Sequence, residues 1–108
     1  MRRIMRVRIF EQRTGALLAD ASGDQVVKVE GNWYVDPATV SKQLQMSSHD
    51  YTCPYKGKCY YADFVDGATR SIDVAWVYDN PKPGWENIKG KFGFYAGERS
   101  NTRDEVTP

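Results

Sequence analysis

The stretch "CYYADFVDGATRSIDVAWVY", residues 59–78, contains the clearest β pattern of the sequence. Its first part, residues 59–65, alternates polar with apolar and aromatic side chains, which predicts a half-buried strand. A second alternation follows, with one face formed by Ile72, Val74, Trp76 and Tyr78. Between the two, "DGAT" at residues 66–69 is typical of a hairpin connection. The stretch therefore predicts two antiparallel strands joined by a tight turn.

Shorter strands are expected on both sides of this hairpin, because β-prone runs are separated there by turns that contain glycine or proline. The runs are residues 5–9, 16–19, 26–35 and 91–95. We expect one short helix, from Pro37 to Gln45. Asp36 is a good N-cap, and proline suits the first helical position.

This pattern predicts a mainly β domain. We expect a compact antiparallel fold with one short helix, built as two packed sheets or as a small open barrel. The 108 residues fit one domain with one core. Residues 1–97 are expected to form that single β domain, and the polar residues 98–108 a flexible tail.

Composition and charge exclude several classes of partner. The formal net charge is +1, too small to indicate a nucleic-acid or membrane partner. The arginines near the start, Arg2, Arg3, Arg6 and Arg8, are not followed by the apolar run of a signal peptide. No segment approaches the roughly 18 apolar residues of a membrane-spanning helix. We therefore expect a cytoplasmic protein with reduced cysteines.

A second stretch, "HDYTCPYKGKCYY" at residues 49–61, holds the only histidine and both cysteines. Pro54 and Gly57 predict a tight turn within it, since one fixes and the other frees the backbone. Structural zinc sites use four ligands, with cysteines two to four residues apart. Here five residues separate Cys53 from Cys59, and no second pair exists. We therefore expect neither a metal nor another cofactor.

The same stretch holds the two candidates for catalysis. His49 can act as an acid or a base near neutral pH. Cys53 has Lys56 and His49 nearby in sequence, and positive charge favours the reactive thiolate. A single thiol can equally be a small buried apolar group. The residues leave open whether the domain is an enzyme.

Candidate ligand-binding groups surround the predicted turn. Lys56 projects from it as a mobile charge suited to an anionic group, and no acidic residue close by in sequence is an obvious partner. Hydroxyl groups come from Thr52, Tyr61, Tyr78 and Tyr95. Together these side chains predict a pocket for a small anionic or carbonyl-bearing ligand. The alternative is that Lys56 is solvated and the tyrosines are core residues.

Several segments resemble the family known as domain of unknown function 427. They are "TCPYKGKCYY", "VAWVYDNP" and "IKGKFGFYAG", in this order, with "NWYVDPATV" upstream. The resemblance covers residues 7–97 and implies a compact, mostly antiparallel β fold without an established activity. A nucleotidyltransferase label is attached to the family. That chemistry needs closely spaced carboxylates that bind Mg²⁺. The candidates here, Asp63, Asp66 and Asp73, are instead typical of solvated acids on a hairpin.

Three hypotheses follow. The first is a cytoplasmic β domain that binds a small molecule, with His49 or Cys53 as the reactive group if the domain is an enzyme. The second is a non-catalytic interaction module or homodimer, with Trp85 and tyrosines as anchors. The third, nucleotidyl transfer, rests on the family label alone.

Overall fold

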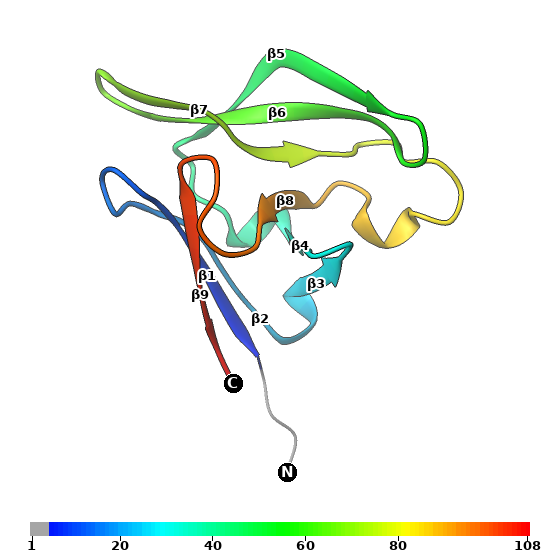
Figure 1. The fold of residues 1–108 in the computed structure, drawn as a ribbon, viewed down its shortest axis with the longest axis horizontal. Helices are drawn as coiled ribbons and strands as arrows, with labels where there is room; N and C mark the ends of the chain where they lie inside the picture. Colours follow the sequence, from blue (N-terminus) through cyan, green and yellow to red (C-terminus); the bar gives the residue numbers. More distant parts are fainter. Residues whose placement is uncertain (1–4) are drawn as a thin grey trace.

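The computed structural model describes residues 5–108 and contains two antiparallel sheets (Figure 1). The smaller sheet has the order β2-β1-β9 and consists of β1 (Arg6–Glu11), β2 (Leu17–Ser22) and β9 (Thr102–Thr107). The larger sheet has the order β3-β4-β8-β7-β6-β5. Its strands are β3 (Val26–Val29), β4 (Asn32–Val35), β5 (Leu44–Cys53), β6 (Gly57–Asp66), β7 (Thr69–Val77) and β8 (Phe92–Tyr95). The predicted mainly β, two-sheet architecture is confirmed.

Neighbouring residues of the larger sheet pack on opposite faces, as the pleat of a strand requires. Trp33 of β4 joins a core cluster that includes Val7 and Ile9 of the small sheet. Tyr34, the next residue, belongs to a second cluster. The second cluster also contains Cys53, Cys59, Trp76, Tyr78 and Ile88. The larger sheet therefore has one face against the small sheet and another, aromatic face turned away from it.

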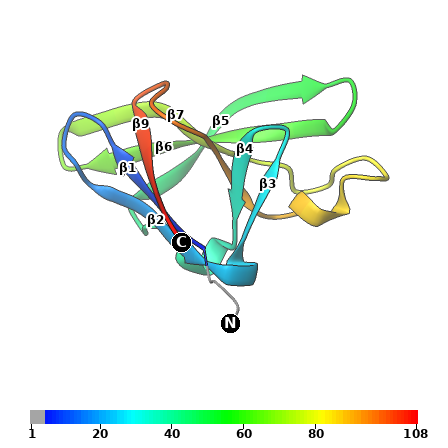
Figure 2. The same ribbon diagram turned by 60° about the horizontal axis from the view of Figure 1, so that its bottom comes forward.

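The turn between β5 and β6 lies at the end of the molecule far from the small sheet (Figure 2). Residues 54–56 form this turn, as the proline and glycine of the sequence predicted. The loop between β7 and β8, which contains the short 3₁₀ turn η3 (Glu86–Ile88), packs against it. The backbone N–H of Lys82 donates to the carbonyl of Lys56 at 2.8 Å. The side chain of Lys82 reaches the carbonyl of Pro54 at 3.0 Å.

The helix expected from Pro37 to Gln45 is wrong. The N-cap prediction was sound locally, because the Asp36 carboxylate accepts the N–H of Ala38 at 2.9 Å. The helical turn η2 stops at Thr39, however, and β5 begins at Leu44. From there the chain pairs with β6, so sheet hydrogen bonds replace those of a helix. The other 3₁₀ turn, η1, spans Gly23–Gln25.

The expectation of a flexible tail from residue 98 also differs from the structure. Strand β9 pairs with β1 without a break, from Arg6 opposite Thr107 to Glu11 opposite Thr102. Thr102 is fully buried. The indole N–H of Trp33 donates to the Asp104 carboxylate at 2.7 Å. The domain therefore extends through the segment that the polar composition suggested was loose.

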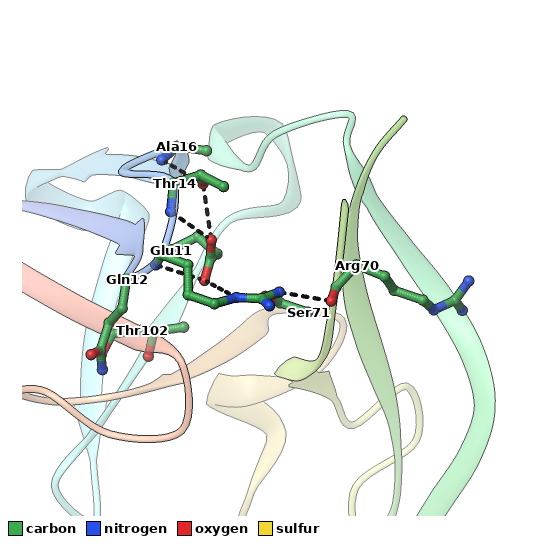
Figure 3. Close-up of polar contacts among 8 residues, drawn as sticks. Glu11, Gln12, Thr14, Ala16, Arg70, Ser71 and Thr102 are labelled. Atoms are coloured by element: carbon green, nitrogen blue, oxygen red, sulfur yellow. Dashed lines mark hydrogen bonds and ion pairs between the residues drawn. The ribbon is translucent and has the colours of Figure 1, made fainter. Parts of the chain in front are cut away.

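A buried carboxylate organises the junction of the two sheets (Figure 3). Glu11 has no exposed surface and accepts hydrogen bonds from the backbone of Arg13 and from both the backbone and the hydroxyl of Thr14. Arg13 in turn donates across the junction to the carbonyl of Arg70 and the hydroxyl of Ser71, both in β7. Glu11 thus holds the arginine that ties the small sheet to the large one.

Two of the four arginines near the start have defined partners. Arg6 makes an ion pair with Asp20 at 2.7 Å, and Arg8 approaches the same carboxylate at 3.8 Å. Arg2 and Arg3 lie outside the described residues. In the part of the chain that the structure describes, no helix has the length and apolar character needed to cross a membrane.

Candidate functional site

A pocket of about 160 Å³ lies on the aromatic face of the larger sheet. Five tyrosines contribute to its wall: Tyr34, Tyr51, Tyr61, Tyr78 and Tyr95. The remaining lining residues are Asn32, Lys56, Cys59 and Trp76. These side chains come from β4, β5, β6, β7, β8, the β5–β6 turn and, for Tyr78, the position just after β7. The pocket therefore forms only when these five strands are assembled.

Trp76 forms the buried floor of this tyrosine pocket. Its indole N–H donates to the Tyr34 hydroxyl at 3.1 Å, and the two rings meet edge to face with centroids 6.2 Å apart. The Tyr95 ring is a second neighbour of the Trp76 ring, with the two centroids 4.8 Å apart. Such contacts fix ring orientations as well as burying apolar area. The orientation of the floor is therefore defined by one hydrogen bond and two ring contacts.

Burial favours the protonated form of three of the tyrosine hydroxyls. Burial raises the pKa of Tyr34, of Tyr61 and, most strongly, of Tyr78. Burial likewise raises the pKa of the Cys59 thiol, which lies near the Tyr78 hydroxyl. Neutral phenols can donate a hydrogen bond to a carbonyl or carboxylate oxygen. The wall thus offers donors together with flat apolar rings.

Lys56 reaches the pocket from the β5–β6 turn, and its charge has a partner. Its ammonium forms an ion pair with Glu30 and lies 4.8 Å from the centre of the Trp85 ring. Only 14% of the Lys56 side chain is exposed. Burial acts to lower the pKa of Lys56, but the hydrogen bond and charge of Glu30 outweigh it, and the pKa is raised. The sequence offered no partner close to Lys56; the structure supplies a distant one, Glu30, from the turn between β3 and β4.

Cys53 and Thr52 end strand β5 beside the turn, but neither lines the pocket. Cys53 is a free, buried thiol whose sulfur accepts the backbone N–H of Lys56 at 3.4 Å. Burial works to raise the pKa of this thiol, yet the N–H groups of Lys56 and Tyr55 and the Lys56 charge leave it lowered. Thr52 is exposed, and alternation along the strand directs it away from Tyr51.

His49 also stands outside the lining, next to one of its tyrosines. The imidazole stacks on the Tyr61 ring with centroids 4.6 Å apart and 25° between planes. Its Nδ1 lies 2.9 Å from a carboxylate oxygen of Asp73 in β7. Of the residues selected from the sequence, the structure therefore gathers Lys56, Tyr61, Tyr78 and Tyr95 in the pocket. It places His49 at the rim.

Sequence reasoning missed Asn32, Tyr34, Tyr51, Cys59 and Trp76 as lining residues. A signal was present for some of them. Cys59 lies two residues from Tyr61, and Trp76 two residues from Tyr78, so each pair shares a face if the segment is a strand. For Asn32 and Tyr34 no local signal existed, because only the pairing of β4 with β8 brings them to this place.

The carboxylates considered for nucleotidyl transfer are engaged elsewhere. Asp63 is buried, accepts the Asp73 backbone N–H at 2.9 Å and pairs with Arg70 at 2.9 Å. Asp73 pairs with His49, and Asp66 is exposed at the end of β6. Within residues 5–108, no three His, Cys, Asp or Glu side chains gather in a way that could hold a metal ion.

Trp85 packs over Lys56 and against the second core cluster. It is partly buried, in the loop that leads into η3. The sequence suggested Trp85 as an anchor of an interaction module or homodimer; in the structure it packs against residues of its own chain. Its ring faces the Lys56 ammonium, so Trp85 is part of the surroundings of the pocket.

Fold and site together define a small antiparallel β domain with an aromatic, donor-rich pocket on the outer face of its larger sheet. The chain belongs to the family described as domain of unknown function 427, whose sequence model, named NTP_transf_9, matches residues 2–105. The resemblance found in the sequence is thereby confirmed over nearly the whole chain. A search of curated proteins finds no match.

Proposed function

We propose that the tyrosine pocket binds a small anionic or carbonyl-bearing molecule. One observation carries this proposal: five tyrosines, a lysine and an amide line the pocket, and no carboxylate does. Hydroxyl and ammonium groups donate hydrogen bonds to oxygen, and a lysine adds positive charge. An anion or a polarised carbonyl is the ligand that such a wall accommodates best.

The size of the pocket narrows the class of ligand. A cavity of about 150 Å³ can hold a molecule the size of benzene, and this pocket has a volume of about 160 Å³. It therefore suits a small carboxylic acid, ketone or aldehyde. Nucleotidyl transfer is not part of the proposal, because Asp63 pairs with Arg70 and Asp73 pairs with His49. We also propose that the protein works in a reducing compartment such as the cytoplasm, because both cysteines are free thiols.

The first prediction concerns Lys56 and is tested with acetate, pyruvate, benzoate and acetone as probes, by calorimetric titration and thermal shift. Lys56→Met should weaken the binding of the tightest-binding anion by about 1–3 kcal/mol, the range for a hydrogen bond to a charged group. Lys58→Met is the matched control, because Lys58 belongs to the same hairpin but is exposed and pairs with Asp50. Its removal should leave binding unchanged.

Glu30 provides a test in the opposite direction. Because Glu30 competes for the Lys56 charge, Glu30→Gln should strengthen anion binding while leaving acetone binding unaffected. The proposal fails if no probe binds the wild-type protein. It fails equally if Lys56→Met and Lys58→Met bind every probe alike.

A further inference from the structure

Strands β5 and β7 both depart from regular pairing with β6, the strand between them (Figure 1). The β5–β6 register shifts between Met46 and Asp50, and the β6–β7 register shifts between Ala62 and Phe64. His49 lies in the first irregular segment and Asp73 opposite the second. Bulges re-aim side chains and are frequent beside active sites. Here they bring a histidine and an aspartate from non-adjacent strands into contact.

The backbone at Asp73 is held in an unusual conformation. Its φ is 56°, in the left-handed region that non-glycine residues rarely adopt. The buried carboxylate of Asp63 accepts the Asp73 N–H at 2.9 Å and is itself paired with Arg70. Non-glycine residues in this region persist where surrounding contacts over-determine them, which is common at functional sites. Asp63 and Arg70 are such contacts.

The hydrogen-bond pattern defines which imidazole nitrogen is available. An ionised carboxylate only accepts hydrogen bonds, so Nδ1 of His49 carries the hydrogen in its 2.9 Å contact with Asp73. Nε2 of the neutral ring is then left as an acceptor. The ring stacks on Tyr61, and Tyr51 follows two residues along β5; both tyrosines line the pocket.

We infer that His49 and Asp73 form a proton-transfer pair at the rim of the tyrosine pocket, a role that rests on the function proposed above. Nε2 of His49 takes a proton from an O–H, or from a C–H next to a carbonyl, of the bound molecule. The electron pair of that bond stays on the ligand, whose negative charge faces the tyrosine hydroxyls and Lys56. The imidazolium formed stays paired with Asp73, which acts as a positioning residue.

The second prediction tests the geometry by nitrogen NMR, which is unambiguous because the chain has one histidine. At a pH where the ring is neutral, wild-type His49 should be protonated at Nδ1. Asp73→Asn should shift the ring towards the Nε2–H form. Asp50→Asn, next to His49 but directed to Lys58, should leave the spectrum unchanged. A wild-type ring protonated at Nε2 would overturn the inference.

Bromopyruvate tests whether this nitrogen faces the pocket. Nε2 should displace bromide to form a carbon–nitrogen bond, leaving an imidazolium paired with Asp73. Peptide mass mapping should locate the adduct on His49, at a rate that saturates with reagent and is severalfold slower in Asp73→Asn. Equal rates in wild type and Asp73→Asn would contradict the pair. A third outcome separates the two proposals. If His49 carries its hydrogen on Nδ1 and its alkylation rate depends on Asp73, but the rate does not saturate with reagent, the pair stands and only the pocket function is contradicted.

Discussion

Gly93 of β8 shows how one residue determines the shape of the pocket floor. It lies opposite Trp76 in the β7–β8 pairing. A Cβ atom added there would stand 2.4 Å from the indole nitrogen, the same atom that donates to Tyr34. Real Cβ atoms do not approach that closely, so the bare glycine is what allows the indole to lie flat across the neighbouring strand.

We therefore expect Gly93→Ala to displace Trp76 and to lower the free energy of unfolding by about 1–3 kcal/mol, as overpacking does. Urea titration followed by tryptophan fluorescence measures this cost. In a Trp76→Phe background the same substitution should cost less, because the overlapping part of the indole is gone. Equal costs in both backgrounds would show that the contact with Trp76 is not the cause.

At the scale of elements, strand β7 shows the limit of reading alternation. The sequence placed Ile72, Val74 and Trp76 on one face, but Ile72 is 62% exposed, Val74 packs towards the small sheet and Trp76 packs on the opposite face. Residues 72–74 have no regular partner in β6, and regular pairing resumes only at Ala75. Val74 lies inside this irregular segment and Trp76 beyond it, so simple alternation does not relate the two. A shift of this kind moves side chains to the other face of a sheet.

Strand β9 gives an element-scale prediction. A chain ended after Glu98 loses the partner of β1 and the Asp104 acceptor of the Trp33 indole. We expect this shortened chain to show no cooperative thermal unfolding by circular dichroism. Removal of Pro108 alone should leave the unfolding transition unchanged. A melting temperature within about 4 °C of the full chain, roughly 1 kcal/mol for a domain of this size, would mean that β9 is dispensable.

At the scale of the whole molecule, the Glu11–Arg13 network links stability to pH. Burial acts to raise the pKa of Glu11, but hydrogen bonds from Arg13 and Thr14 leave that pKa lowered. Because the carboxyl pKa is lower in the folded state, Glu11 stabilises the fold at pH values above its pKa in the unfolded chain, which is near 4.3. This contribution is lost as the pH falls through the lower, folded pKa.

Glu11→Gln should therefore reduce the unfolding free energy at pH 7 by roughly 1–3 kcal/mol, the cost of weakening buried hydrogen bonds. It should also flatten the loss of stability between neutral and acidic pH, measured by urea titration at several pH values. Asp24→Asn serves as the control, because Asp24 has an ordinary surface position in η1. A variant with the wild-type slope would exclude Glu11 as a source of the acid sensitivity.

The sequence by itself determined where polar and apolar residues alternate along the strands and where the main turns fall. Alternation in residues 59–78 predicted the β6–β7 hairpin, and Pro54 with Gly57 predicted the β5–β6 turn. Residue type was enough to select Lys56, Tyr61, Tyr78 and Tyr95, because the lysine lies in the predicted turn and the tyrosines offer hydroxyl groups.

The tertiary structure decided what depends on distant pairing. It limited the expected helix after Asp36 to the short turn η2, added β9 to β1, and gave Lys56 its partner Glu30. It also joined His49 to Asp73 across an intervening strand. Local propensity amounts to only a few tenths of a kcal/mol per residue. A sheet partner that supplies many hydrogen bonds and buries apolar area outweighs it, and the sequence near each residue does not reveal that partner.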